Sequence, residues 1–268
     1  MTLVLREPAG RHALDEVVGG GGLLAFDFDG TLAPIVREPA SASPRASTRE
    51  LLARLALAHP CAVISGRARQ DVVERLRGIA FVEIIGNHGA EPPPPGTDES
   101  LIQRRVALWH TILAGELLGL PGIEIEDKRL SLAIHFRRTR DQAAAEDRIR
   151  LALQRATGGR VVGGACVVNV VPEELPDKGG ALRQLCARLG AESVLFVGDD
   201  TTDEDVFRAQ IPGLVGVRVG RVASHAKYFL QDQVEIDDLL RELLQLASRR
   251  VAGAALASAA RRTSVDGR

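Results

Sequence analysis

The stretch LLAFDFDGTL, residues Leu23–Leu32, decides the fold. Its first six residues, Leu23–Phe28, are largely apolar and are bounded by Gly19–Gly22 before them and by Asp29-Gly30 after them. A short apolar run between turn residues predicts a buried strand of a parallel sheet. Two carboxylates therefore stand where this strand ends.

Helical and strand-like segments alternate on both sides of this strand. Helices are predicted at Ser47–Ala58, Asp71–Leu76, Lys178–Leu189 and Glu235–Ala247, and strands at Cys61–Ile64, Val82–Ile85, Ser193–Val197 and Leu214–Val219. Such alternation is typical of βαβ units built around a parallel sheet. The last twenty residues or so are rich in Ala, Ser and Arg, which predicts a frayed helix followed by disorder.

The alternation of strands and helices is interrupted at Pro92–Pro95, where four consecutive prolines favour a domain boundary. The segment beyond it has predicted helices at Ser100–Leu118 and Asp141–Ala156, and β-rich runs at Ile123–Asp127, Leu130–Arg137 and Val161–Val171. The βα pattern resumes after Pro176. We therefore expect a discontinuous core of residues 1–93 and 174–268, and a smaller α+β domain inserted at residues 94–173.

Composition excludes several classes of protein. The 268 residues carry 34 basic and 35 acidic side chains, so the net charge of −1 does not favour a nucleic-acid partner, and aromatic residues reach only 3%. No apolar run reaches the roughly 18 residues that span a bilayer, so we expect no membrane partner. Three unpaired cysteines and the absence of an apolar leader predict a cytoplasmic protein. The oligomeric state stays open, and a monomer is compatible with the sequence.

Polar clusters follow three of the predicted strands directly. They are Asp27–Thr31, Ser65–Arg67 and the predicted polar loop Gly198–Asp205, which holds five acidic residues within seven. Ligands of open α/β sheets bind outside the carboxyl ends of the strands, so these clusters can converge in space. Crowded carboxylates repel one another unless a cation neutralises them, and oxygen ligands with a phosphate are the usual surroundings of Mg²⁺.

These residues resemble the haloacid dehalogenase (HAD) superfamily of phosphatases. The resemblance rests on four blocks in order: DFDGTL at Asp27–Leu32, Ser65, Lys178, and GDDTTDED at Gly198–Asp205. It implies an α/β fold with a HAD-like Rossmannoid core, a parallel sheet and an inserted α+β cap. It also implies that Asp27 is the nucleophile that forms an aspartyl phosphate, and that Asp29 is the general acid and base. In the same way, Ser65 and the amide of Gly66 hold the phosphoryl group, and Lys178 neutralises its charge.

The metal expected from this resemblance is Mg²⁺. Its implied ligands are Asp27, the backbone carbonyl of Asp29 and Asp199, with Asp203 and Asp200 in support. The metal and Lys178 would stabilise charge on the phosphoryl oxygens.

An extended set of blocks is similar to the trehalose-6-phosphate phosphatase family. The matching blocks are SGR (Ser65–Arg67), GNHG (Gly86–Gly89), ExK followed by HxR (Glu126, Lys128, His135, Arg137), GDDxTDED, and VGxxxSxAxYxL near Val219–Leu230. The resemblance implies that the cap contacts the sugar. The substrate-binding residues that we expect are Gly66, Arg67, Asn87, His88, Glu126, Lys128, His135, Arg137 and Asn169. Taken without the resemblance, the cap residues would be ordinary surface side chains.

One position departs from the family pattern. Where many members carry Glu on a cap strand, this chain has Asn169, which can hydrogen-bond hydroxyl groups but brings no charge. The sequence therefore predicts Mg²⁺-dependent hydrolysis of a sugar phosphate, with trehalose 6-phosphate as the favoured substrate in trehalose biosynthesis. The alternatives are a phosphatase for another phosphorylated disaccharide or glycoside, a sugar phosphomutase, and a silent sugar-phosphate sensor.

Overall fold

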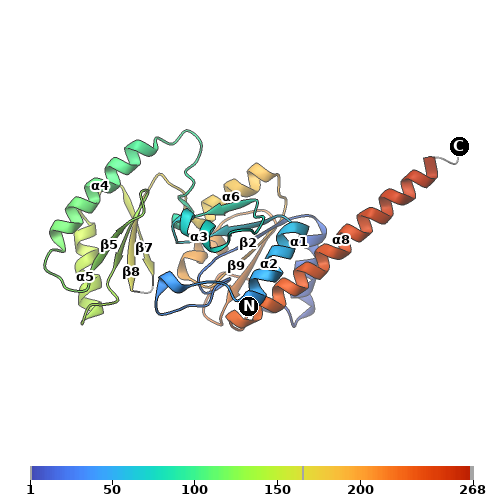
Figure 1. Ribbon diagram of the computed structural model, residues 1–268, viewed down its shortest axis with the longest axis horizontal. Helices are drawn as coiled ribbons and strands as arrows, with labels where there is room; N and C mark the ends of the chain where they lie inside the picture. Colours follow the sequence, from blue (N-terminus) through green and yellow to red (C-terminus); the bar gives the residue numbers. More distant parts are fainter. Residues whose placement is uncertain (1, 165, 266–268) are drawn as a thin grey trace.

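The computed structural model describes residues 2–164 and 166–265, which form two sheets with separate helical layers (Figure 1). The larger sheet has seven strands, and every neighbouring pair in it is parallel. Its order is β1 (Thr2–Leu3), β11 (Tyr228–Leu230), β10 (Leu214–Val219), β9 (Val194–Gly198), β2 (Leu23–Phe26), β3 (Cys61–Ile64) and β4 (Glu83–Ile85). The strand predicted from Leu23 onward therefore lies inside the sheet, between β9 and β3.

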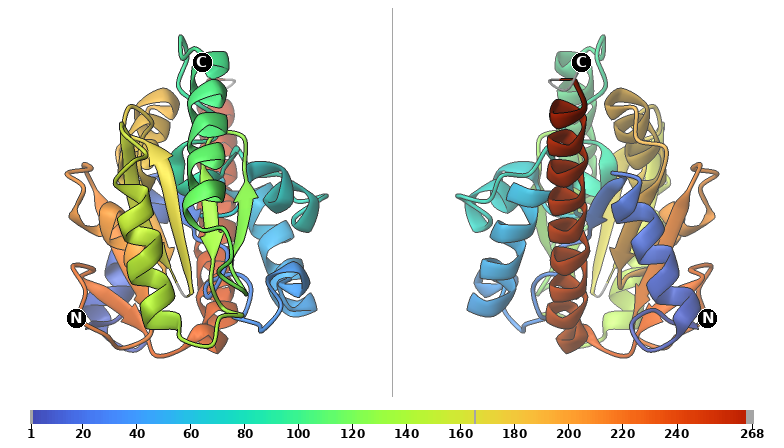
Figure 2. Two further views of the ribbon diagram at one scale, coloured as in Figure 1. Left: turned by 90° about the vertical axis from the view of Figure 1, so that its left-hand side faces the viewer. Right: turned by 90° about the vertical axis from the view of Figure 1, so that its right-hand side faces the viewer.

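Helices cover both faces of the parallel sheet. On one face α1 (Pro8–Gly19), α2 (Ala46–Ala58), α3 (Arg69–Arg75) and α8 (Ile236–Val265) share one buried apolar cluster with the strands (Figures 1 and 2). On the other face α6 (Lys178–Leu189) and α7 (Glu204–Arg208) pack in a second cluster. Because both faces are covered, the four residues of β2 are all buried, as are those of β3.

The smaller sheet is antiparallel, in the order β5 (Glu124–Asp127), β6 (Leu132–His135), β8 (Val167–Pro172) and β7 (Gly159–Gly164). Two helices, α4 (Glu99–Glu116) and α5 (Gln142–Leu153), cover the face that points away from the larger sheet (Figure 2). Trp109, Leu113 and Ile149 lie in the buried cluster between these helices and the strands. The other face carries Glu126, His135 and Asn169 beside Ala133.

The expected fold class is confirmed: a parallel α/β sheet accompanies a separate antiparallel sheet with its own helices. The β-rich run 161–171 is confirmed and consists of the strands β7 and β8. One finer expectation was wrong, because the predicted loop 198–205 contains a 3₁₀ turn, η3 (Thr201–Asp203), and the start of α7. The last helix continues to Val265, and the disorder expected at the end of the chain falls on residues 266–268, outside the described part. The elements β1, α1 and β11 were not predicted.

Helix α6 illustrates how local sequence sets a boundary. The Asp177 carboxylate accepts a hydrogen bond from the Gly180 N–H at 2.7 Å, which satisfies one of the free N–H groups at the helix start. The helix ends at Gly190, whose φ of 64° is the left-handed conformation that glycine adopts at little cost. The cap at Asp177 fixes Lys178 as the first residue of the helix.

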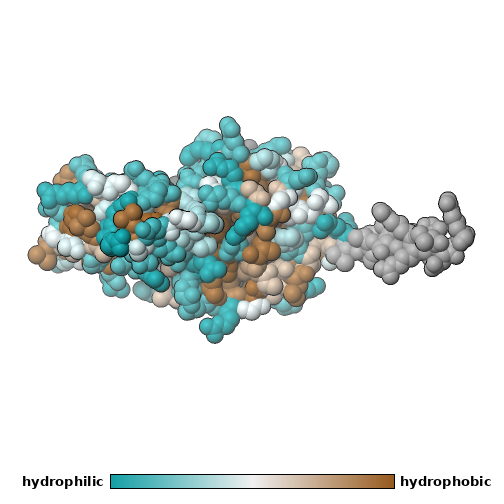
Figure 3. Space-filling model, turned by 90° about the horizontal axis from the view of Figure 1, so that it is seen from above, coloured by the Kyte–Doolittle hydropathy of each residue, from teal (hydrophilic) through white to brown (hydrophobic). Residues whose placement is uncertain are grey.

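The surface mixes apolar and polar residues. On the face seen in Figure 3, hydrophobic residues are interspersed with hydrophilic ones over both halves of the molecule. Among the described residues, no helix combines the length and apolar character needed to cross a membrane.

Replacing Leu113 by Ala should destabilise the smaller, antiparallel part of the molecule by about 2–5 kcal/mol, because Leu113 is fully buried and its loss leaves a cavity. The only tryptophan of the chain, Trp109, lies in the same cluster, so fluorescence-detected urea unfolding reports on this region. Leu108→Ala on the same helix is the matched control, since Leu108 is 58% exposed. Equal midpoints for the two variants would contradict the packing described here.

Candidate active site

Strand order brings the predicted polar clusters together. Strands β9, β2 and β3 are neighbours, and all run in the same direction, so their carboxyl ends share one edge of the sheet. Asp199 directly follows β9, Asp27 directly follows β2, and Ser65 directly follows β3. Although these residues are up to 172 positions apart in the sequence, the parallel pairing places them side by side.

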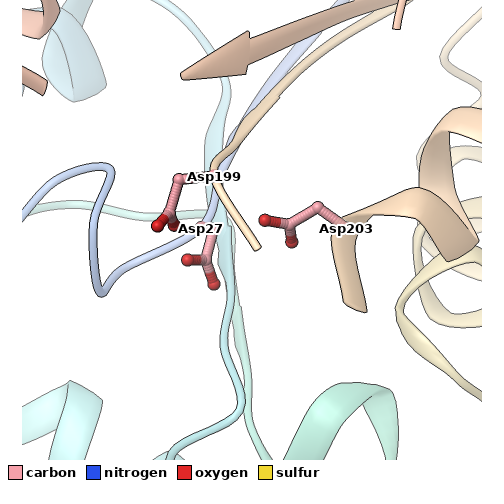
Figure 4. A group of neighbouring side chains, drawn as sticks. All are labelled: Asp27, Asp199 and Asp203. Atoms are coloured by element: carbon pink, nitrogen blue, oxygen red, sulfur yellow. The ribbon is translucent and has the colours of Figure 1, made fainter. Parts of the chain in front are cut away.

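Three carboxylates point toward one another at this edge (Figure 4). Asp27, Asp199 and Asp203 each offer an oxygen, and these oxygens all lie within 4.8 Å of one another. Burial, with the negative charge of Asp203 as the second cause, raises the pKa of Asp199 to about 7. Burial likewise raises the pKa of Asp27, with Asp203 and Asp199 adding to the effect and Lys178 opposing it. A cation among these oxygens would relieve both shifts, so the donor set fits a divalent metal such as Mg²⁺.

Lys178 connects the nucleophile candidate to the acidic loop. Its Nζ donates to Asp27 Oδ1 at 2.8 Å and to Asp203 Oδ1 at 2.7 Å, and all three side chains are buried. Burial by itself would lower the pKa of Lys178, but the two carboxylates outweigh it and raise the pKa. The ammonium group therefore stays charged and fixes the direction of the Asp27 carboxylate.

Gly30 allows the loop after β2 to approach the loop after β9. Its φ is 76°, and a Cβ atom at this position would lie only 1.9 Å from Asp199 Oδ2. Thr31, which follows, donates from its hydroxyl group to Asp199 Oδ1 at 3.5 Å. Glycine is thus required here both by the backbone conformation and by the close approach.

Asp29 lies beside the carboxylate cluster and is held by Arg67. Arg67 Nε donates to Asp29 Oδ2 at 2.6 Å, and Arg67 Nη2 donates to Asp29 Oδ1 at 2.7 Å. The same guanidinium donates to Asp71 and to the Pro39 carbonyl, and it lies 5.4 Å from the centre of the Phe28 ring. All three guanidinium nitrogens of Arg67 therefore contact protein groups in this conformation.

The Ser65-Gly66 loop is ordered by its neighbours. Ser65 Oγ accepts a hydrogen bond from the Arg67 backbone N–H at 3.2 Å, and the Ser65 side chain is buried. The carbonyl of Gly66 accepts from Lys128 Nζ at 3.2 Å, so a lysine of the smaller sheet's edge reaches this loop. Burial lowers the pKa of Lys128.

Asp200 and Asp203, the two further residues of the acidic loop that were predicted to support the metal, have different surroundings. The Asp200 carboxylate accepts from the Thr201 N–H at 2.7 Å and caps η3, and it is not part of the three-carboxylate group. Asp203 uses Oδ1 for Lys178 and Oδ2 for the Asp200 N–H at 2.9 Å. Asp200 thus shapes the loop, while Asp203 links the loop to Lys178.

Asn87 and His88 lie in η2 (Asn87–Gly89), where the larger part of the molecule meets the smaller one. Asn87 Oδ1 accepts from Ser131 Oγ at 3.0 Å, and Asn87 Nδ2 donates to the Lys128 carbonyl at 3.4 Å. Burial lowers the pKa of His88 well below its usual range, and the charges of Lys128 and Lys178 lower it further, so the imidazole is neutral.

The register of the smaller sheet places several predicted residues on its polar face. Glu126 pairs with Ala133, and Ala133 pairs with Asn169, so Glu126 and Asn169 share this face with His135, two residues further along β6. His135 Nε2 lies 2.8 Å from Glu126 Oε2. Asn169 is buried, donates from Nδ2 to the Val162 carbonyl at 3.3 Å, and hydrogen-bonds the His88 side chain. Arg137 is exposed beyond the end of β6.

Sequence reasoning missed Arg218, a buried arginine on β10 beside the acidic loop. Its Nη1 donates to the Asp200 carbonyl at 2.6 Å and lies 3.5 Å from Glu204 Oε1. The signal was present, because Arg218 is the one charged residue in the otherwise apolar strand LVGVRV. A charge inside a buried strand calls for a partner of opposite charge.

Affinity for Mg²⁺ should rise with pH between 6 and 8, because the Asp199 carboxyl, with its pKa raised to about 7, must lose its proton before it can bind a cation. The increase is up to about tenfold per pH unit for one displaced proton. Calorimetric titration with Mg²⁺ at several pH values measures it. Asp199→Asn should weaken binding and flatten the profile, whereas Asp238→Asn, on the surface of α8, should change neither. A wild-type affinity independent of pH would contradict the assignment.

Comparison with known proteins agrees with this geometry. The family model for trehalose-phosphatase matches residues 25–234. The trehalose-phosphate phosphatase of Mycobacterium avium is 35% identical over 212 residues, which cover 73% of this chain and 53% of that protein. The probable trehalose-phosphate phosphatase 9 of rice is 29% identical over 277 residues, covering 88% of this chain and 74% of the rice protein. This chain therefore spans about half the length of its mycobacterial relative.

Among solved structures, the C-terminal domain of Candida albicans trehalose-6-phosphate phosphatase superposes with a TM-score of 0.71, covering 92% of this chain and 98% of that domain. At 22% identity this likeness establishes the fold alone. The family match spans every strand-end cluster described above, from Asp27 to Asp203. The chain belongs to the trehalose-phosphatase family.

Proposed function

We propose that this protein hydrolyses a sugar phosphate, with trehalose 6-phosphate as its substrate, through a covalent phosphoenzyme. The observation that carries the proposal is the buried Asp27 carboxylate, which is ion-paired to Lys178 and faces the carboxylates of Asp199 and Asp203. Relatives in the matched family are named trehalose-phosphate phosphatases. The parallel sheet would form the core (residues 1–93 and 174–268), and the antiparallel sheet would form a cap over it (94–173).

Asp27 serves as the nucleophile. One of its carboxylate oxygens attacks phosphorus, the bond between phosphorus and the ester oxygen breaks, and the leaving sugar oxygen takes a proton from the Asp29 carboxylic acid. In the second step water attacks phosphorus and gives its proton to Asp29. The bond from Asp27 to phosphorus then breaks and releases inorganic phosphate. Lys178 supports both steps, because its charge stabilises the phosphoryl oxygens and its two ion pairs orient the nucleophile.

Asp29 must be partly released by Arg67 before it can transfer a proton. In the present conformation both Asp29 oxygens accept hydrogen bonds from that guanidinium. We propose that substrate binding draws Arg67 toward the phosphate or the sugar, which frees one oxygen of Asp29. Asp71 and the Pro39 carbonyl would retain the other guanidinium nitrogens.

The residues that would hold Mg²⁺ are Asp27, Asp199 and Asp203, with the Asp29 carbonyl completing the set and Asp200 shaping the loop. When bound, the metal would supply positive charge to the phosphoryl oxygens. The side chains of Ser65 and Lys178 and the Gly66 amide would bind the same phosphoryl group. The bonds that form and break at phosphorus involve Asp27, the sugar oxygen and water, and Asp29 transfers the protons.

The cap would bind the sugar. Its polar face carries Glu126, His135 and Asn169, and Lys128 already contacts the core loop at Gly66. Each of these side chains can exchange a protein partner for a sugar hydroxyl, and closure of the cap would exclude bulk water while the phosphoryl group is transferred to Asp27. We expect the exposed Arg137 to contact the sugar as well.

A second candidate is the same reaction on another phosphorylated disaccharide or glycoside. Asn169 favours it, because the carboxylate found at this place in many family members is replaced by a neutral amide that is buried and bonded to Val162 and His88. A site with one charge fewer recognises a different set of hydroxyls. We also propose a cytoplasmic location, which suits the three free cysteines.

A panel of sugar phosphates tests the substrate. With Mg²⁺ present, trehalose 6-phosphate should release phosphate with the highest kcat/KM, ahead of sucrose 6-phosphate and glucose 6-phosphate. Asp27→Asn should abolish release, and Asp29→Asn should lower kcat by about 10²–10⁴-fold, because it removes general acid–base catalysis. A chelator should suppress the reaction, and added Mg²⁺ should restore it. A higher kcat/KM for another sugar phosphate would show that trehalose 6-phosphate is not the preferred substrate. Full activity of Asp27→Asn would contradict the assignment of Asp27 as the nucleophile.

Lys128→Met should raise KM for the preferred sugar phosphate more than it lowers kcat, since Lys128 bridges cap and core and carries no step of the chemistry. We expect a rise of about 10–150-fold, which corresponds to the loss of one charged hydrogen bond at about 1.5–3 kcal/mol. Arg138→Met is the matched control, because Arg138 is an exposed cation of the same domain. Steady-state kinetics measures KM and kcat for both variants. An unchanged KM in Lys128→Met would show that Lys128 does not bind the sugar phosphate.

A further inference from the structure

Arg218 holds a position that the proposed chemistry does not use. It lies on β10, paired in register with Gly198, the last residue of β9 before the acidic loop Asp199–Asp203. Only 7% of it is exposed. A buried guanidinium costs free energy unless its partners compensate for lost water, so its contacts should explain its presence.

The principal contact of Arg218 is with the backbone of the acidic loop. Its Nη1 donates to the Asp200 carbonyl at 2.6 Å, a short bond from a charged donor. On the other side of the same residue, the Asp200 N–H donates to Asp203 Oδ2 at 2.9 Å. The peptide groups before and after Asp200 are therefore both fixed, one by Arg218 and the other by Asp203.

This double attachment determines where Asp199 points. The described contact of the Asp199 side chain itself is a long one, 3.5 Å from Thr31 Oγ1. Its direction must therefore come largely from the backbone of the loop. Arg218 supplies the attachment that does not involve any of the three clustered carboxylates, so it stays in place when those carboxylates bind a cation.

Glu204 gives Arg218 a carboxylate partner outside the cluster, while the charge of Arg218 also acts on Asp199 and opposes the rise of its pKa. Glu204 Oε1 lies 3.5 Å from Arg218 Nη1, and Glu204 Oε2 accepts a hydrogen bond from the His225 N–H at 2.9 Å. Glu204 thereby joins Arg218 to the segment that follows β10. The Nε atom of Arg218 is buried without a hydrogen-bond partner among the described residues. Leaving this N–H group without a partner costs free energy. The hydrogen bond from Nη1 to the Asp200 carbonyl must offset that cost, so this bond sets the orientation of the guanidinium.

We propose that Arg218 is a positioning residue that holds the backbone of the Asp199–Asp203 loop in the conformation that gathers the carboxylates of Asp27, Asp199 and Asp203. The consequence for binding, that loss of Arg218 weakens a divalent cation, rests on the metal site of the proposed function. Residues that hydrogen-bond to the metal-binding residues, without binding the metal themselves, typically change metal affinity by about 10–100-fold when they are removed.

Hydrogen exchange tests the loop directly, without any metal. Arg218→Met fills similar space but removes the donor and the charge, and it should speed amide exchange in the segment 199–203. Because it also leaves the buried Glu204 carboxylate without its cation, the double variant Arg218→Met/Glu204→Gln is made in parallel to keep the fold stable. Both Arg218 variants should show faster amide exchange in this segment than the wild type. The single variant Glu204→Gln keeps the hydrogen bond from Arg218 to the Asp200 carbonyl, so its exchange should be accelerated less.

Metal binding is then measured by calorimetry with Mg²⁺ and by the electron paramagnetic resonance signal of Mn²⁺. We expect both Arg218 variants to bind these ions about 10–100-fold more weakly. At saturating Mg²⁺ their KM for the sugar phosphate should match that of the wild type. Arg208→Met, at the exposed end of α7, is the control and should leave affinity, exchange and activity unchanged.

The outcomes separate the two proposals. Wild-type exchange rates and wild-type metal affinity in folded Arg218 variants would overturn the role of Arg218. A lower melting temperature with unchanged affinity and exchange would show a purely structural role and would overturn it equally. A wild-type protein that binds neither ion would instead refute the metal site of the proposed function. The exchange data would still decide whether Arg218 orders the loop.

Discussion

The site depends on one buried interaction, the pair of ion pairs from Lys178 to Asp27 and Asp203. Three charged side chains with almost no exposure are stable only together, because each would be strongly unfavourable if its partner were lost. The pairing also has a structural consequence. It joins the end of β2, the start of α6 and the η3 turn, which are far apart in the sequence, at one point of the sheet edge.

The parallel sheet makes this meeting possible. Adjacent parallel strands end at the same edge, so the residues that follow β9, β2 and β3 necessarily become neighbours. The loops can then come closer than ordinary side chains permit, as the contact between Gly30 and Asp199 shows. Burial raises the pKa of Asp199, the negative charge of Asp203 adds to this, and Lys178 offsets it only in part, so a cation suits the cluster.

Polar side chains make several of the contacts between the cap and the core, and Ala90 and Leu175 also join the apolar cluster of the cap. Asn87 bonds Ser131, Lys128 bonds the Gly66 carbonyl, and Asn169 bonds His88. Hydrogen bonds of this kind can be exchanged for bonds to sugar hydroxyls at little net cost, whereas a buried apolar interface would resist opening. In the proposed function, the same side chains would hold the cap near the core in one state and contact the sugar in another. Asn169 would contribute no charge to this exchange.

The sequence by itself determined the alternation of strands and helices, the separation into two sheets, and the strand-end positions of Asp27, Ser65 and Asp199, because each of these is encoded in local patterns of apolar and turn residues. It did not reveal Arg218, the bidentate contact of Arg67 with Asp29, or the different surroundings of Asp200 and Asp203. It also placed a loop where η3 and α7 begin, since their hydrogen bonds come from capping by Asp200 and Asp203 within a run that reads as polar. Only the tertiary structure decided these, because a charged side chain takes its partner from whatever the fold brings near, and sequence spacing carries no record of that distance.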